Sequence, residues 1–180
     1  MIRLAIIGSS GKNPLDLEKY SIDHFTFMTE TINSYIKNTI QTELSNIILV
    51  SNGSAWADHV AVQLYLTRQY GGLELYLASK FDLKHSRYVN THEGRSLNKL
   101  HQQCQEKTQI NVLGELAKVQ YRPNVKITVK RGFVARNTLV AHNCDHIITF
   151  TFSETVLDNI IVHTLNKVKH NNKYHAFLNA

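Results

Sequence analysis

Cysteine is scarce in this sequence. Its 180 residues contain only two cysteines, Cys104 and Cys144, which lie far apart and have no metal-ligand pattern near them. We therefore expect neither a disulfide framework nor a structural zinc site. The ten histidines are scattered along the chain, and we expect most of them at the surface or in loops. The sequence predicts no metal site and no bound cofactor.

Long apolar runs are absent as well. No run approaches the roughly 20 residues that a membrane span needs. The apolar stretch from Met1 to Gly8 is too short for the core of a signal peptide and is typical of a buried first strand. We therefore expect a soluble protein of the cytoplasm, of a cell or of an infected host, without a membrane partner.

Repeats, low-complexity stretches and linkers are also missing from the chain. A length of 180 residues is enough to bury a hydrophobic core, and 43% of the residues are hydrophobic. The sequence therefore predicts a single domain over residues 1–180.

The formal net charge is +6, with 20 Lys and Arg against 14 Asp and Glu. Such a surplus fits a nucleic-acid partner, and it fits equally an anionic small molecule drawn into a positive pocket. The cationic residues are spread along the chain, apart from a small cluster at Lys126, Lys130 and Arg131. This spread favours the small molecule over nucleic acid.

Short apolar runs rich in β-branched residues recur along the chain and end in small or polar residues. They predict strands at residues 2–7, 47–50, 73–77, 125–129 and 146–150, with a further strand at 174–178. The spacing of apolar residues between them predicts helices at 25–40, 55–70, 94–120 with a break near Asn111, 133–142 and 156–168. Such alternation implies an α/β, Rossmann-like three-layer fold, with helices flanking a mainly parallel sheet. Residues 80–94 are predicted to form a long polar loop.

Ligands of open parallel sheets bind beyond the carboxyl ends of the strands. Two of the predicted ends carry glycine, which lets a backbone approach a ligand, together with side chains that hydrogen-bond phosphate oxygens. These residues are Gly8, Ser9 and Ser10 after the first strand, and Ser51, Asn52, Gly53 and Ser54 after the second. The second group opens a helix, whose free N–H groups also suit a phosphate.

A third strand end leads into a helix that carries Arg136 and Asn137. The arginine offers a planar, charged fork for a phosphate, and the asparagine can bond a ribose hydroxyl or fix the loop. Asp58, in the first turn of an earlier helix, either stabilises that helix or bonds a ligand hydroxyl. Because the strands are expected to be parallel, these groups should meet. We expect one shared pocket lined by Gly8, Ser9, Ser51, Gly53, Ser54 and Arg136.

Three segments resemble motifs of the SLOG superfamily, a group of Rossmann-like domains. They are Ser51-Asn52-Gly53-Ser54-Ala55-Trp56-Ala57-Asp58-His59, Arg136-Asn137 after Gly132-Phe133, and Gly94-Arg95-Ser96-Leu97-Asn98-Lys99-Leu100-His101. The last of these resembles a motif of an uncharacterised bacterial and viral branch. The superfamily includes LOG-type phosphoribohydrolases, DprA-type DNA-processing proteins and domains that sense NAD-derived nucleotides. The resemblance implies nucleotide binding, and it adds Arg95 to the expected ligand-binding residues.

The chain departs from the family pattern in two places. Asn52 stands where the family has glycine, and the glycine-rich phosphate loop of LOG-type enzymes is absent after Phe152, where the chain reads Glu154-Thr155-Val156. Phosphoribohydrolase activity therefore does not carry over directly from the resemblance.

Three functions follow from these residues. The first is capture of a phosphorylated nucleotide or an ADP-ribose derivative without turnover, with Lys84, His85, Arg87, His92 and Arg95 of the polar loop closing over the ligand. The second is cleavage or transfer of an N-glycosidic bond, for which Glu154 and Asp58 are the carboxylates to consider, with Glu93 behind them. The third is DprA-like binding of single-stranded DNA, which requires an aromatic and basic groove. We favour the first, and we expect a homo-oligomer.

Overall fold

The structure, a computed structural model that describes residues 1–152 and 159–178, contains a six-stranded sheet in the order β6-β3-β2-β1-β7-β8. Every neighbouring pair of strands in this sheet is parallel. The strands are β1 (Ile2–Gly8), β2 (Ile47–Ser51), β3 (Gly72–Leu77), β6 (Val125–Val129), β7 (His146–Thr151) and β8 (Lys173–Phe177). The α/β, Rossmann-like prediction is therefore confirmed, including all six predicted strands.

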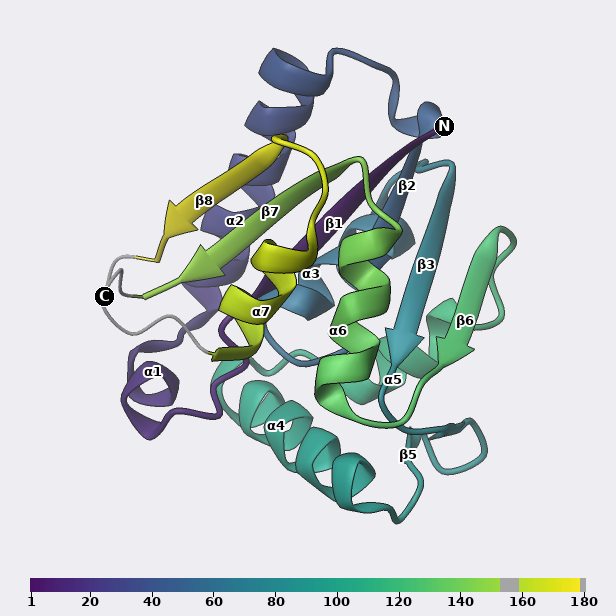
Figure 1. The fold of residues 1–180 in the computed structure, drawn as a ribbon. Helices are drawn as coiled ribbons and strands as arrows, with labels where there is room; N and C mark the ends of the chain where they lie inside the picture. The colour runs from purple at the N-terminus through teal and green to yellow at the C-terminus, as the bar shows by residue number, and fades with distance from the viewer. Residues whose placement is uncertain (153–158, 179–180) are drawn as a thin grey trace.

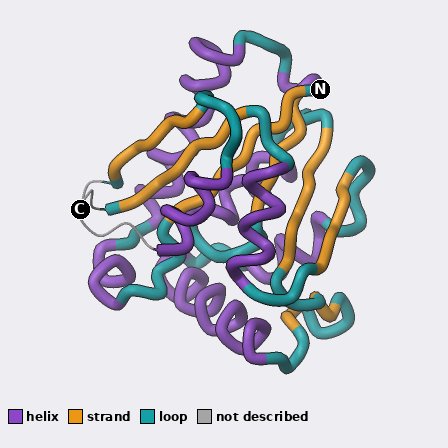
Figure 2. The backbone as a smooth tube through the Cα atoms, viewed as in Figure 1, coloured by secondary structure: helices purple, strands orange, loops and turns teal. Residues whose placement is uncertain are grey.

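Helices cover both faces of this sheet (Figures 1 and 2). In Figure 1, α6 and α7 lie in front of the strands, whereas α2, α3 and α5 lie behind them, and α4 crosses beyond their carboxyl ends. The helices are α1 (Pro14–Lys19), α2 (Ile22–Tyr35), α3 (Ala57–Thr67), α4 (His92–Thr108), α5 (Val112–Val119), α6 (Phe133–His142) and α7 (Asn159–Lys167). A short π-helix (Ile36–Ile40) extends α2, and a 3-10 turn (Leu44–Asn46) precedes β2.

The central strands are apolar on both sides because both faces of the sheet are covered. Successive side chains of a strand point to opposite faces. In β1, Leu4 and Ile6 belong to the larger buried cluster, whereas Ala5 and Ile7 belong to the smaller cluster. All four side chains are at most 1% exposed, so β1 joins the two layers of the core.

The predicted break of the long polar helix near Asn111 is confirmed. Helix α4 ends at Thr108, and Asn111 caps α5 through a hydrogen bond that Oδ1 accepts from the Gly114 amide at 2.9 Å. An Asn side chain at this position satisfies an amide that has no partner within the helix.

The predicted irregular loop at residues 80–94 is wrong in part. Its chain forms a small antiparallel pair, β4 (Phe81–Asp82) with β5 (Arg87–Tyr88), and α4 already begins at His92. Thr91 starts this helix early because its hydroxyl accepts a hydrogen bond from the Gly94 amide. Among the described residues, no helix is long and apolar enough to cross a membrane.

Candidate functional site

A cavity of about 40 Å³ opens at the carboxyl ends of β1 and β2, beside the amino-terminal turns of α3 and α6. Its polar lining comes from all three strand ends singled out in the sequence. These residues are Gly8, Ser10, Asn52, Ser54, Asp58, Arg136 and Asn137. A cavity needs roughly 10–15 Å³ to hold one water molecule, so this cavity matches a few waters or one compact oxyanion.

Gly8 brings the backbone of β1 close to its neighbours at the base of the cavity. A Cβ atom at this position would lie 2.4 Å from the Phe150 carbonyl oxygen and 2.6 Å from the Ala57 Cβ. Glycine at this position, with alanine opposite it, lets the first turn of α3 pack directly against the sheet. The amino terminus of α3 is thereby held next to the strand ends.

The segment from Ser51 to Ser54, here called the binding turn, is fixed by hydrogen bonds within itself. The Gly53 amide donates to Ser51 Oγ at 3.3 Å, and the Ser54 amide donates to Asn52 Oδ1 at 3.0 Å. Gly53 has a φ of +67°, a conformation that favours glycine. Because Oδ1 of Asn52 is used inside the turn, the Nδ2 group of this cavity-lining side chain is the end left for a ligand.

Arg136 reaches the binding turn from α6, a distant part of the sequence. The side chain is only 4% exposed, and its Nη1 donates to the Asn52 carbonyl at 3.2 Å while Nε donates to Asn137 Oδ1 at 3.0 Å. The guanidinium also lies 5.1 Å from the centre of the Phe133 ring. Burial lowers the pKa of Arg136, partly offset by nearby Asp58 and Tyr88, and the group stays charged at neutral pH.

Three polar groups of this lining make no hydrogen bond within residues 1–152 and 159–178: Asn52 Nδ2, Ser54 Oγ and Arg136 Nη2. Each belongs to a side chain that is 4% exposed. The three atoms retain some access to the cavity, so water or a ligand can reach them. Together on one small cavity, with one of them cationic, they form an arrangement that an anion with several oxygen atoms would satisfy.

Three of the six residues expected to share a pocket line the cavity: Gly8, Ser54 and Arg136. The other three lie behind its wall and build it. The Ser9 carbonyl accepts a hydrogen bond from Tyr20 Oη, and Ser51 Oγ donates to the Asp58 carbonyl at 2.7 Å. The Gly53 carbonyl points away from the cavity, toward Tyr88 and His101.

Arg95 does not line this cavity. It is exposed, donates to Asn90 Oδ1 at 3.0 Å and lines a separate hollow beside Arg87 and Asn98. The reason is helical phase: successive residues of α4 point about 100° apart, so that its neighbour Ser96 lines the cavity instead. None of the five cationic loop residues expected to close over the ligand lines the cavity, and Glu154 lies outside the described residues.

The sequence reasoning missed the apolar half of the lining. The cavity is also lined by the apolar side chains of Phe133, Leu100, Ile160 and Ile161, and Ile7, Lys12 and Ser96 complete the lining. Phe133 lies three residues before Arg136, one turn away on α6, so helical spacing offered a signal for it. Ile160 and Ile161 come from α7 and carry no motif that points to the site.

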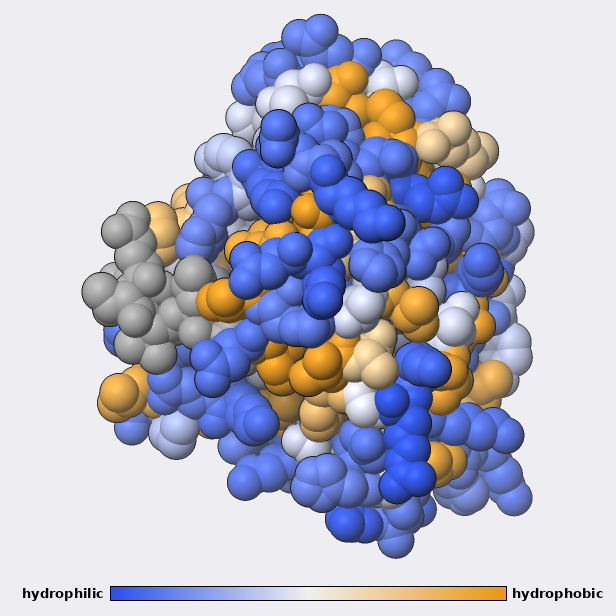
Figure 3. Space-filling model, viewed as in Figure 1, coloured by the Kyte–Doolittle hydropathy of each residue, from blue (hydrophilic) through white to orange (hydrophobic). Residues whose placement is uncertain are grey.

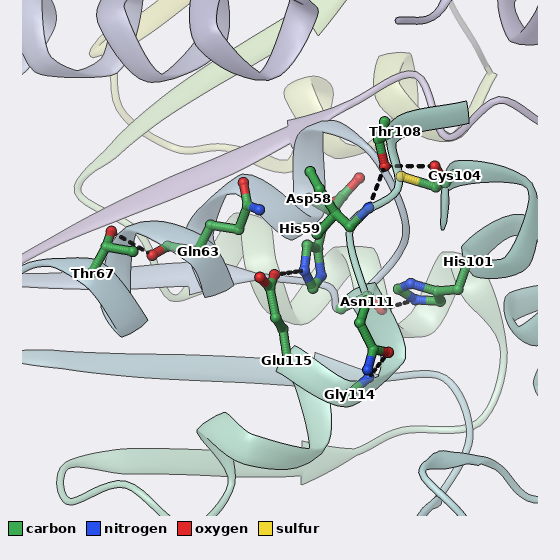
Figure 4. A network of polar contacts seen from close by, with 12 residues as sticks. Asp58, His59, Gln63, Thr67, His101, Cys104, Thr108, Asn111, Gly114 and Glu115 are labelled. Atoms are coloured by element: carbon green, nitrogen blue, oxygen red, sulfur yellow. Dashed lines mark hydrogen bonds and ion pairs between the residues drawn. The ribbon is translucent and has the colours of Figure 1, made fainter. Parts of the chain in front are cut away.

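A network of polar contacts joins residues of α3, α4 and α5 (Figure 4). His59 Nε2 donates to Glu115 Oε2 at 2.7 Å, and the His59 and His101 rings lie 6.0 Å apart in an edge-to-face arrangement. His59 and His101 are both fully buried. Among the described residues, no cluster of His, Cys, Asp or Glu has the arrangement of a metal site.

Comparison with known proteins places this chain in a family with a viral protein. No model of a known protein family matches the chain, and no solved structure matches it. The chain is 42% identical over 172 residues to the uncharacterized protein R261 of Acanthamoeba polyphaga mimivirus, and the match covers 96% of this chain and 93% of the viral protein. At this identity and coverage, the chain belongs to the same family as that viral protein.

Proposed function

We propose that the cavity binds a phosphorylated nucleotide or a nucleotide-derived ligand such as an ADP-ribose derivative. One observation carries this proposal: the three unpartnered groups of Asn52, Ser54 and Arg136 converge on a cavity the size of one phosphoryl group. Hydrogen bonds from a cationic donor to a phosphate are short and strong. The resemblance of the binding turn to a SLOG motif supports the same ligand class.

The apolar wall supports a ligand larger than free phosphate. Phe133 is half-buried and presents a ring next to the Arg136 guanidinium, and Leu100 lies on the same cavity. Ligand pockets commonly combine an apolar lining with a few polar groups that orient the ligand. With the phosphoryl group on Arg136, the rest of the nucleotide extends past these apolar side chains toward solvent.

Trp56 provides a direct readout of binding. It is the only tryptophan of the chain, it is fully buried, and it follows Ser54 by two residues. We expect inorganic phosphate, AMP and ADP-ribose to change its fluorescence in a saturable way, whereas adenosine, which lacks a phosphate, has little effect. Equal binding of AMP and adenosine would contradict the phosphate assignment.

Asn52→Asp is the sharpest test of the site. The aspartate keeps an Oδ1 acceptor for the Ser54 amide, but it replaces the Nδ2 donor with a negatively charged oxygen. We expect phosphate and AMP affinity to fall by about ten- to a hundredfold or more, since a hydrogen bond to a charged phosphate is lost and a charge repulsion is added. The matched control is Asn46→Asp, the same charge change at an exposed residue before β2, at the opposite end of the sheet.

The Arg136→Ala variant should affect the fold as well as the site. Since the guanidinium is buried and holds the Asn52 carbonyl, its removal lowers stability as well as affinity.

Mass spectrometry of the incubated nucleotides separates the two chemical alternatives: an unchanged ligand means capture, and a released base means an N-glycosidic-bond hydrolase.

A second candidate function, sequence-independent binding of nucleic acid, is favoured by how the charges gather in space. The basic face, as we call it, holds seven Lys and Arg and only two acidic residues, so that it carries +5 of the formal charge of +6. The seven are Lys80, Lys84, Arg87, Arg95, Lys99, Lys130 and Arg131, and the two are Asp82 and Glu93. Hydrophilic residues dominate the region over α4 and β5 in Figure 3.

A hydrogen bond and an ion pair join these segments, although they are separate in sequence. The Lys130 amide donates to the Leu77 carbonyl at 2.8 Å, and Arg131 lies 3.9 Å from Glu93 at the start of α4. Labelled oligonucleotides whose fluorescence anisotropy is followed at rising salt test this function. If the protein contacts the phosphate backbone of the oligonucleotide, its affinity should fall steeply as the salt concentration rises. Binding should be lost in the double variant Arg87→Glu, Arg95→Glu. It should be retained in the control double variant Lys37→Glu, Lys118→Glu.

A further inference from the structure

Two buried side chains converge on one carbonyl oxygen of the binding turn. Tyr88 Oη donates to the Gly53 carbonyl at 2.6 Å, and His101 Nε2 lies 3.1 Å from the same oxygen. Because a carbonyl only accepts, the His101 ring carries its proton on Nε2. Tyr88 comes from β5 and His101 from α4, and they are 1% and 0% exposed. Neither side chain lines the cavity.

The geometry of the peptide group carries this contact to the cavity. The unit between Gly53 and Ser54 is planar, so fixing its carbonyl oxygen also fixes its N–H. That N–H, from Ser54, donates to Asn52 Oδ1 at 3.0 Å. The Asn52 amide is therefore held in the orientation that leaves Nδ2 for a ligand.

Both donors are themselves held in place. Asn98 brackets Tyr88 with two hydrogen bonds of 2.9 Å, one from the Tyr88 amide to Oδ1 and one from Nδ2 to the Tyr88 carbonyl. The Tyr88 ring stacks on His101 with centroids 5.8 Å apart. Burial, together with the nearby His59 and Arg136, lowers the pKa of His101 to about 3, so the ring stays neutral near pH 7.

We propose that Tyr88 and His101 are positioning residues for the anion site, which act through the Gly53 carbonyl to hold Asn52 ready for the ligand. The inference rests on the proposed function. It gives the pair of strands β4 and β5 a role different from that of a cover over the ligand: they support the binding turn from behind. Affinity at the cavity then depends on a hydroxyl and an imidazole that never touch the ligand.

The test uses inorganic phosphate as the probe and Tyr88→Phe as the first variant, because phenylalanine keeps the ring and removes only the hydroxyl. We expect phosphate affinity to fall about three- to tenfold, the range for one neutral hydrogen bond. The matched control is Tyr65→Phe, which removes a hydroxyl that donates to the Pro123 carbonyl, away from the cavity lining. It should leave phosphate affinity unchanged.

A second pair of variants separates positioning from general stability. His101→Gln keeps an N–H donor and should retain most of the affinity, whereas His101→Leu removes the donor and should lose as much as Tyr88→Phe. The side-chain amide signals of Asn52 in a ¹⁵N spectrum should shift in Tyr88→Phe and His101→Leu but stay in place in Tyr65→Phe and His101→Gln.

The outcomes are distinguishable. If the wild-type protein binds neither phosphate nor AMP nor ADP-ribose, the proposed function and this inference are both overturned. If it binds one of them and Tyr88→Phe and His101→Leu bind it equally well, only the inference is overturned. A loss of the same size in Tyr65→Phe or in His101→Gln also overturns it, since the effect would then not depend on the donors to Gly53.

Discussion

Gly8 lines the cavity and Gly132 precedes the cavity-lining Phe133, and the two glycines are required for different physical reasons. At Gly8 the space is closed, because a Cβ would collide with the Phe150 carbonyl and with Ala57, neither of which is the end of a flexible side chain. At Gly132 nothing lies within 4 Å of the added atom, but φ is +91°. The first residue is limited by packing and the second by backbone conformation.

These causes predict different costs for alanine. Gly8→Ala should lower the free energy of unfolding by roughly 1–3 kcal/mol, the range for overpacking, and should disturb the cavity. Gly132→Ala should cost about 1 kcal/mol through strain. Urea unfolding followed by Trp56 fluorescence measures both. A Gly8→Ala variant as stable as the wild type would show that α3 can move away from the sheet.

His101 makes stability depend on pH. Its pKa is about 3 in the folded protein and 6.5 in its ordinary state, so the unfolded chain takes up a proton first as the pH falls. Stability should therefore decrease from about pH 6.5 to pH 3, with this residue contributing up to ~1.4 kcal/mol per pH unit. In His101→Gln the slope of unfolding free energy against pH should be smaller by about one proton. An unchanged slope would mean that His101 is not buried in its neutral form.

Sequence patterns located the strand ends but not the direction of each group. Ser51 and Gly53 stand in the motif that marked the site, yet they point into the protein, because the turn uses their polar atoms to fix itself. Which atom of a turn faces a ligand depends on partners from other elements. Tyr88 and His101 lie more than 30 residues away from Gly53. His101 ends one of the three SLOG-like segments, but that resemblance does not show which group it contacts.

At the scale of elements, α1 follows the cavity-lining Lys12 and has little stability of its own. It has six residues and none of them is buried, and isolated helices of this length do not form in water. Its carboxyl end is capped from α4: Lys107 Nζ donates to the carbonyls of Leu17, Glu18 and Tyr20. The Tyr20 ring then stacks on Trp56 with centroids 4.0 Å apart.

Lys107→Met should release this helix while the core stays folded. Methionine keeps much of the aliphatic stem and removes the three donors, so we expect faster hydrogen exchange over residues 13–20 and a small loss of global stability, about 1 kcal/mol. The control is Lys118→Met, in an exposed position of α5. Exchange that stays slow in Lys107→Met would show that the Tyr20–Trp56 stack is sufficient to hold α1.

The elements that sequence predicted well are those whose apolar pattern is long. Helix α6 was located at its observed bounds, and the break before α5 was found from Asn111. The β4–β5 pair was missed because two-residue strands carry no period, and its formation depends on Phe81 and Tyr88 being buried against the rest of the protein. Local sequence does not report such tertiary burial.

At the scale of the whole molecule, the sheet separates two layers of unequal size. The larger cluster lies on the side of α2, α3 and α5, and the smaller one on the side of α6. The two-sided apolar character of the strands made this three-layer arrangement predictable. The gathering of charge on the basic face was not predictable, since Lys130 and Arg131 reach the other five cations only through the pairing of β3 with β6.

Because strands β1 and β7 contribute to both layers, the two layers should unfold together. Ile147 and Ile148 are consecutive, fully buried residues of β7 that belong to the smaller and the larger cluster respectively.

Ile147→Val and Ile148→Val each remove one methylene, at a cost of about 0.5–1.5 kcal/mol. Two probes report on the two layers: Trp56 fluorescence for the larger, and hydrogen exchange of the α6 amides for the smaller. A shared strand predicts that either substitution shifts both probes by the same free energy. If Ile147→Val accelerated exchange in α6 and left the Trp56 transition in place, the layers would be separate cooperative units, and the sheet would not transmit stability between them.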